Sequence, residues 1–278
     1  MGAHGLWIGG LDVVKKPIRA VDLSGLLTVS AKRGENMEVP GRSGSIHLPA
    51  KLYEGTRAPF QFQLWGTLPD GSVPPDPSLQ LWRDNLRRLG RVLSQPGLVP
   101  LVHQLPDGTF REVPVEVAVA LDPEVSKTSD YGTVAIAFDS PSAFWRGQST
   151  VSIPLSLANG ATRTLTELDT CDAPIEDALV TFGPCTNPRL ADSVTGTFLA
   201  YDAVIGSGQT LTINTATLRM TGTGGLVPDR TKLRTHATDA RWLVLQPSTT
   251  GPAVVTFTHN GSGSVPVTIV ARPSWLWG

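Results

Sequence analysis

Alternation of apolar and polar residues with a period of two constrains this 278-residue chain more than any other feature. Apolar residues occupy every second position in three segments, 60–65, 113–121 and 134–139. Successive side chains of a strand point to opposite faces of a sheet, so each segment presents one apolar row. Asp107-Gly108 precedes the second segment and is typical of a hairpin turn, because both residue types tolerate φ > 0. The sequence therefore predicts a mainly β fold.

One segment has a helical period instead. Its apolar residues recur at steps of three and four and form a single stripe: Leu79, Trp82, Leu86, Leu89 and Leu93. Asp76-Pro77 can cap and open a helix before this stripe, and Pro96-Gly97 ends it. We expect one α-helix over about 77–95, laid on the β domain.

The composition changes in the second half of the chain. Residues 151–278 hold 22 of the 29 threonines, and Thr suits a half-exposed face of a sheet. Short strands are expected there, separated by turns of Gly, Asn and Pro and without a helical stretch: 211–213, 218–220, 242–245, 254–258 and 265–271. This pattern predicts an antiparallel β-sandwich. We place the domains at 1–147, a β domain with one helix, and 148–278, the sandwich.

Charge and hydropathy exclude several classes of protein. The chain has 24 acidic and 23 basic residues, which gives a net charge of −1 and no basic field for nucleic acid. The longest uncharged run, 242–271, is interrupted by Pro and Gly and does not read as a membrane span. The first residues lack the basic and apolar regions of a secretory signal. We expect neither membrane insertion nor sequence-specific binding of nucleic acid.

Motifs that carry chemistry are missing from the sequence. It contains no GxGxxG, no P-loop and no GxSxG elbow, and its five histidines are far apart. We therefore expect no enzymatic activity, no catalytic residue, no cofactor and no metal site. Cys171 and Cys185 enclose a short loop, and they are interpreted either as two buried thiols or as a bridge that closes the loop.

The expected helix carries four arginines against a single acidic residue, Asp84: Arg83, Arg87, Arg88 and Arg91. One interpretation is a solvated helix face. The other is a face that meets an acidic patch on a neighbouring subunit.

Four aromatic residues of the second half are candidates for contact with sugars or with a partner: Tyr201, Trp242, Trp275 and Trp277. An exposed indole or phenol can stack on a sugar ring or anchor an interface, because it buries a large area. Packing inside the sandwich is the competing interpretation of each residue.

An ordered series of short motifs resembles the distal tail protein (Dit) family of long-tailed bacteriophages. A Gly-rich loop at 41–44 precedes the alternating strand and the helix, and Ala143–Gly147 resembles the junction that closes the N-terminal domain. The second half continues the series with these segments: 159–160, 173–174, 183–188, 208–214, 242–247 and 272–275. The Pro- and Gly-rich loop at 68–76 is either a contact arm or a simple turn. The resemblance covers nearly the whole chain.

The resemblance implies a structural role. Such proteins form a hexameric ring at the distal end of the tail tube, where a tail-tube-like N-terminal domain builds the ring and a galectin-like C-terminal sandwich projects outward. Implied partners are further copies of the chain, the tail tube protein and the tail-tip hub protein, with the tape measure and receptor-binding proteins as additional candidates. Implied locations are the virion and, during synthesis, the cytoplasm of the bacterial host. The alternative function is carbohydrate binding, in which the C-terminal sandwich recognises glycans of the host cell wall.

Overall fold

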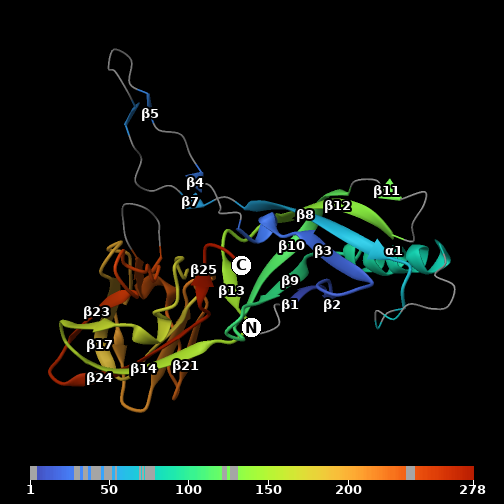
Figure 1. Ribbon diagram of the computed structural model, residues 1–278. Coiled ribbons are helices and arrows are strands. Elements are labelled where there is room, and N and C mark those ends of the chain that lie inside the picture. Colours follow the sequence, from blue (N-terminus) through green and yellow to red (C-terminus); the bar gives the residue numbers. More distant parts are fainter. Residues whose placement is uncertain are drawn as a thin grey trace. The chain divides into compact units, whose positions relative to one another are not determined.

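The computed structural model describes residues 5–27, 55–68, 70, 72, 79–120, 131–235 and 242–278, together with the backbone of five two-residue strands between 32 and 125. The chain divides into two compact units, residues 1–146 with 276–278 and residues 147–275 (Figure 1). Each unit is described by itself. The mainly β fold with an α-helix that the sequence predicts is confirmed.

A curved antiparallel sheet forms the first unit, with its strands in the order β2-β1-β9-β10-β12-β8-β3. Its strands are β1 (Gly5–Ile8), β2 (Leu11–Asp12), β3 (Ile18–Asp22), β8 (Thr56–Trp65), β9 (Val99–Gln104), β10 (Phe110–Ala120) and β12 (Tyr131–Ser140). Two short strands join it, β11 (Glu124–Val125) on β12 and β13 (Trp145–Gly147) on β10. Two separate pairs are β4 (Lys32–Arg33) with β7 (Leu52–Tyr53), and β5 (Met37–Glu38) with β6 (Ser45–Ile46). A 3-10 helix, η1 (Ser24–Leu27), follows β3.

Val13 links the two sides of this sheet. Its N–H donates to the carbonyl of Leu6 in β1, at 2.9 Å, and its carbonyl accepts from the N–H of Ala20 in β3, at 2.7 Å. The alternation seen in the sequence becomes an apolar row that faces the interior. Phe60 of β8 packs edge-on against Phe138 of β12, with ring centroids 5.6 Å apart.

The helix α1 (Leu79–Leu93) packs against β8 through Trp82, Asn85 and Leu89. The Asn85 amide is buried, and its Nδ2 donates to the carbonyls of Trp65 and Thr67, both at 2.8 Å. This pair of bonds ties the middle of the helix to the end of β8. The predicted helix over about 77–95 is confirmed over Leu79–Leu93, while Ser94 and Gln95 already lie in the following turn. The proposed cap at Asp76-Pro77 and the Gly-rich loop at 41–44 lie outside the described residues.

Two antiparallel sheets form the second unit, as the predicted sandwich requires. The five-stranded sheet contains, in spatial order, β14 (Val151–Ala158), β24 (Ser264–Ala271), β16 (Leu179–Phe182), β20 (Thr210–Asn214) and β21 (Met220–Thr223). The other sheet contains β15 (Ala161–Thr164), β23 (Val254–Asn260), β17 (Cys185–Asp192), β18 (Phe198–Tyr201) and β22 (Leu233–Thr235), with β19 (Val204–Ile205) paired to β17. The remaining short elements are η2 (Thr166–Leu168), η3 (Arg230–Lys232) and β25 (Ser274–Trp275).

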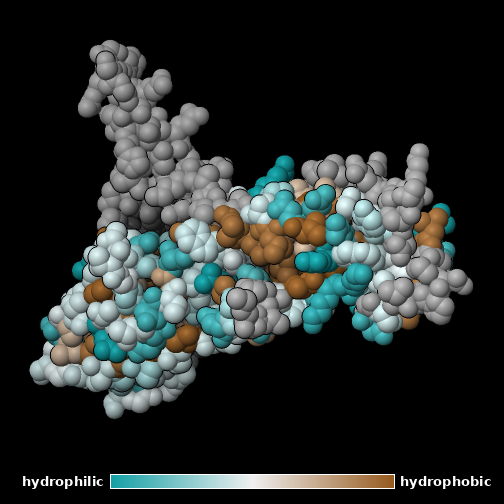
Figure 2. Space-filling view, in the orientation of Figure 1, coloured by the Kyte–Doolittle hydropathy of each residue, from teal (hydrophilic) through white to brown (hydrophobic). Residues whose placement is uncertain are grey.

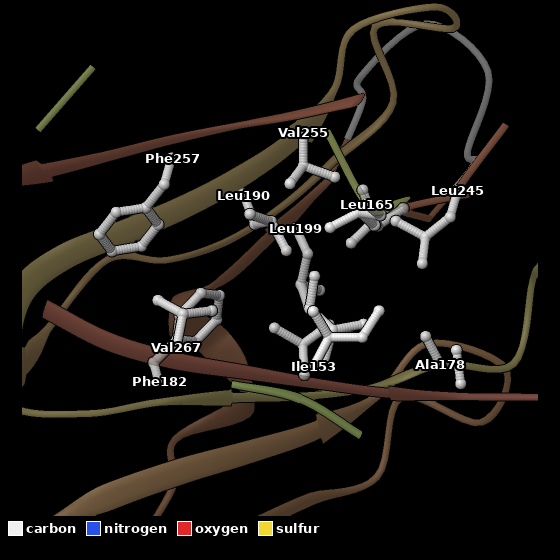
Figure 3. Packing of buried hydrophobic residues seen from close by; sticks show 14 of the residues in the cluster. Ile153, Leu165, Ala178, Phe182, Leu190, Leu199, Leu245, Val255, Phe257 and Val267 are labelled. Carbon is white, nitrogen blue, oxygen red and sulfur yellow. The ribbon is translucent and has the colours of Figure 1, made fainter. Parts of the chain in front are cut away.

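One continuous hydrophobic core lies between these two sheets (Figure 3). Phe182 of the first sheet stacks on Phe257 of the second, with ring centroids 6.1 Å apart and an angle of 24° between the ring planes. Both rings are fully buried. Because both sheets contribute, neither buries its apolar face without the other.

A buried carboxylate fixes the loops of the second unit. Asp192 is 1% exposed, and its Oδ1 accepts from the N–H of Val194 at 3.1 Å and of Thr195 at 2.7 Å. Its Oδ2 accepts from the N–H of Gln246 at 3.2 Å. Burial raises the pKa of Asp192, and the hydrogen bonds that it accepts oppose this effect.

Two local differences from the sequence prediction have a physical cause. The segment 242–245 is not a strand, since the N–H of Val244 donates to the Thr197 hydroxyl at 3.1 Å and Leu245 forms only an isolated bridge with Ile175. Leu218 has φ of +55° in the turn before β21, so the strand begins at Met220 instead.

The last three residues group with the first unit rather than with the sandwich. The N–H of Gly278 donates to the carbonyl of Leu26 at 2.9 Å, and Arg111 donates to the carbonyl of Trp277 at 2.8 Å. Placing all of 148–278 in the second domain did not anticipate these contacts. Among the described residues, no helix combines the length and the hydropathy needed to cross a membrane.

Candidate functional site

The outward side of α1 is the first candidate contact surface. All four arginines that the sequence singled out are exposed on it: Arg83, Arg87, Arg88 and Arg91. Residues four apart lie above one another on a helix, so Arg83, Arg87 and Arg91 form a stripe, which we call the arginine stripe. Arg88 lies beside it. The opposite side of the helix is the one that packs on the sheet.

The positive charge of this surface is only partly balanced. Asp84 is the single acidic residue of the helix, and its Oδ1 accepts from Arg87 at 2.9 Å and from Gln80 at 3.0 Å. This ion pair is solvent-exposed and contributes little to stability. Arg83, Arg88 and Arg91 have no acidic partner within the described part of the chain. Contact with a neighbouring subunit stays a prediction for these residues.

A second charged feature crosses three strands of the first unit. Strand register places Glu116 of β10 opposite Asp139 of β12, and Asp139 opposite Arg57 of β8. Arg57 binds Asp139 with both arms of its guanidinium, at 2.7 Å from Nε to Oδ1 and 2.8 Å from NH2 to Oδ2. The hydrogen bond from Arg57 lowers the pKa of Asp139, and its charge acts in the same direction. We call these three residues the charged row.

The charged row contains two carboxylates and one guanidinium. Both oxygens of Asp139 are taken by Arg57, while Glu116 is exposed and has no cationic partner among the described residues. Like charges directly opposite each other on neighbouring strands repel. Glu116 is therefore placed to accept a further cation from outside this unit. Sequence reasoning missed the row because the three residues are far apart in the chain and meet only through sheet register.

The four aromatic candidates do not form one platform. Tyr201 is 2% exposed, and its hydroxyl accepts from the N–H of Asp229 at 3.2 Å. Trp275 is 3% exposed, and its Nε1 donates to the carbonyl of Thr170 at 2.7 Å. Trp242 is half-buried, and Trp277 is exposed but belongs to the first unit. Tyr201 and Trp275 are thus packed in the interior and present no exposed ring to a sugar.

The outer face of the five-stranded sheet carries a threonine row across four neighbouring strands. In register, these residues are Thr268, Thr181, Thr212 and Thr221. The hydroxyls of Thr181 and Thr212 are 2.9 Å apart and hydrogen-bond each other. Thr210 and Thr223 form a similar pair at 2.6 Å in the adjacent row. Within these two rows the sheet offers hydroxyls without any charged or aromatic side chain.

The two cysteines form no disulfide, so the loop-closing bridge is wrong, and of the two buried thiols expected instead only Cys171 is buried while Cys185 is half-buried. Cys171 is buried, and Cys185 donates its thiol proton to the carbonyl of Gly183 at 3.3 Å. Burial raises the pKa of the Cys185 thiol to about 11. This thiol is protonated at neutral pH and is a poor nucleophile.

Other surface features are modest. Figure 2 shows hydrophobic side chains gathered on one face of the first unit, and three exposed ones are close in sequence: Val21, Leu23 and Leu27. A hollow of about 140 Å³ is lined in part by Leu23, Leu26 and Val13. Among the described residues, no group of three His, Cys, Asp or Glu side chains could hold a metal ion.

Comparison with solved structures identifies the fold. The chain is similar to the SPP1 Dit protein, with a TM-score of 0.60 and 14% identity over 98% of this chain and 99% of that one. Subunits of the phage p2 baseplate in its activated conformation, solved with Sr and with Ca, match with a TM-score of 0.43 and 11% and 10% identity. These matches cover 97% and 98% of this chain, and 98% of each baseplate chain. No protein-family model and no curated protein sequence matches. The resemblance seen in the sequence is thus confirmed at the level of the fold, and the chain has a Dit-like fold over nearly its whole length.

Proposed function

We propose that this chain is a structural protein of a bacteriophage tail tip, and that it forms a ring joining the distal end of the tail tube to the tail-tip hub and receptor-binding apparatus. The observation that carries the proposal is the shared fold, which extends over 98% of the chain. The similar SPP1 protein is described as a paradigm of the hub adsorption apparatus in phages that infect Gram-positive bacteria. A fold alone does not establish a role, so the match over the whole chain supports this proposal together with the surfaces described above.

The surface of the first unit is consistent with assembly. A closed ring of identical subunits uses heterologous contacts, in which two different patches of the same protein meet. The arginine stripe and the charged row are two such patches of complementary charge. Such a role needs contacts between proteins and no catalytic step.

The proposal assigns a different role to each of the two domains. Residues 1–147 would build a ring of six copies, and residues 148–278 would form the outward platform. The partners would be the tail tube protein and the tail-tip hub protein, with the tape measure and receptor-binding proteins as further candidates. The protein would be made in the cytoplasm of a bacterial host and would reside in the virion.

Carbohydrate binding has less support from this structure. Two of its four candidate residues, Tyr201 and Trp275, are buried. The threonine row offers hydroxyls but no ring on which a sugar could stack. A specific sugar site combines polar contacts with such an apolar surface.

The assembly state of the purified full chain tests the proposed function. We expect size-exclusion chromatography with light scattering to give a particle of six times the 29.6 kDa of one chain, and negative-stain electron microscopy to show rings. A monomer at every concentration and salt, with no association with the tube or hub protein of the same phage, would contradict the proposal. In parallel, binding of the full chain to host cell walls that is lost on Trp242→Ala would favour carbohydrate binding.

A further inference from the structure

We infer that the arginine stripe of α1 binds the charged row of a second copy of this chain, with Glu116 as the acceptor of the incoming guanidinium. This inference rests on the proposed function, because it names the surfaces through which one subunit would meet the next.

The helix side of this contact is an unbalanced set of cations. Arg83, Arg87 and Arg91 follow one another at intervals of four, and like charges at this spacing repel along a helix. Asp84 relieves this repulsion at Arg87 alone, with a distance of 2.9 Å. A set of exposed arginines that disfavours its own helix gains most when an anion from another molecule covers it.

The sheet side carries one net negative charge, because its two carboxylates share a single guanidinium. Arg57 is held by both oxygens of Asp139, and Glu116 faces Asp139 directly from the neighbouring strand. A guanidinium from outside would contact Glu116 and relieve its repulsion with Asp139. Guanidinium is the cation best suited to this position, because its fork matches a carboxylate in two parallel bonds.

The two surfaces do not satisfy each other within one copy. No ion pair joins α1 to β10 or β12 among the described residues. Charge complementarity between two different patches of the same unit fits a second copy of this chain. It also gives the head-to-tail contact that generates a ring.

A charge-swap experiment on the full chain tests this contact. Glu116→Arg reverses the sheet side. Arg83→Glu combined with Arg91→Glu reverses the helix side, and both new carboxylates then flank Arg87, which keeps the helix supported by pairs of opposite charge. Each reversal is expected to raise the concentration of half-assembly by at least about tenfold, whereas the combination of all three substitutions should return it to within about threefold of the wild type.

Matched controls separate this contact from a general effect of charge. Asp169→Arg changes the net charge by as much as Glu116→Arg, and Arg219→Glu with Arg230→Glu matches the helix variant, but all three residues are exposed in the second unit. These controls should assemble as the wild type does. Thermal unfolding followed by circular dichroism shows whether each variant is folded.

The inference is overturned if folded Glu116→Arg and folded helix variants assemble like the wild type, or if the combined variant assembles no better than the weaker of the two. If the variants give either of these results while the wild type forms rings, only this contact is overturned and the proposed function still holds. A wild type that stays monomeric overturns both the proposed function and this contact.

Discussion

Each unit of this protein holds an irregular segment in place through one buried polar side chain, which donates hydrogen bonds in the first unit and accepts them in the second. In the first unit Asn85 is a donor, and its amide reaches the carbonyls of Trp65 and Thr67 where β8 ends. In the second unit Asp192 is an acceptor, and it collects the N–H groups of the following turn and of Gln246. Both side chains are at least nine-tenths buried.

The difference concerns charge as well as direction. A buried amide is neutral at every pH, whereas a buried carboxylate must have its desolvation offset by hydrogen bonds. The interiors also differ, since two sheets face each other in the second unit while a curved sheet is covered by one helix in the first. Substitutions should therefore act on one unit at a time, and hydrogen exchange measured by mass spectrometry can follow each unit separately.

The largest effect is expected from Phe182→Ala. It removes a fully buried ring that stacks on Phe257, and such changes cost about 3–5 kcal/mol. Exchange should accelerate throughout the second unit and remain unchanged in β8 and β12. Thr181→Ala, at the adjacent outward-facing position, is the control and should have a small effect. Equal acceleration in both units would show that they do not unfold independently.

Asp192→Ala should come next, at about 3 kcal/mol, because it leaves several buried N–H groups without an acceptor. Urea unfolding of the full chain measures this change, with exchange at 193–197 and 244–246 as the local readout. Asp192→Asn keeps one acceptor oxygen and should cost less. A cost for Asp192→Asn as large as that for Asp192→Ala would mean that the charge, rather than the accepted bonds, stabilises the turn.

Asn85→Ala should cost about 2 kcal/mol and loosen only the first unit, since two carbonyls lose their donor. Exchange should rise in α1 and at the end of β8. Ser94→Ala, near the exposed end of the same helix, is the control. If Asn85→Ala leaves exchange in α1 unchanged, packing of Trp82 and Leu89 alone holds the helix.

The smallest effect is expected for the pH dependence of stability that the Arg57–Asp139 pair causes. The pKa of Asp139 is lowered in the folded protein, so its pairing with Arg57 stabilises the first unit above the ordinary carboxyl pKa of 3.8. That contribution is lost as the pH falls through the lowered folded value. Arg57→Gln should therefore unfold at slightly lower urea concentration than the wild type at pH 7, and the two curves should converge in strong acid. A difference that persists at low pH would point to packing of the Arg57 stem instead.

Local periodicity explains which parts of the fold the sequence predicts. The alternation at 134–139 records one buried face, and the stripe from Trp82 to Leu93 records another that is buried at Trp82 and Leu89, whereas Leu79 at the start of the stripe is exposed. The segment 242–245 has the composition of a strand, but the N–H of Val244 donates to the Thr197 hydroxyl and the N–H of Leu245 donates to the carbonyl of Ile175, which belongs to no strand. Composition alone does not tell which acceptor a backbone group finds.

The candidate surfaces also differ in whether the sequence alone predicts them. The arginines of α1 are visible in the sequence because they share one short helix. Glu116, Asp139 and Arg57 come together only when three strands take their register, and a bulge near Val117 shifts that register along β10. The burial of Tyr201 and Trp275 likewise depends on contacts distant in the chain. The sequence alone does not show whether an aromatic residue is buried or exposed.

The threonine row has one further consequence, which concerns conformational entropy. Threonine is branched at Cβ and has few rotamers to lose, and Thr181 and Thr212 already restrain each other through their hydroxyls. A partner that covered this face would therefore immobilise little that is still free, whereas a partner covering arginines must order long side chains. Per unit area, burial of the threonine row therefore costs less side-chain conformational entropy than burial of the arginine stripe.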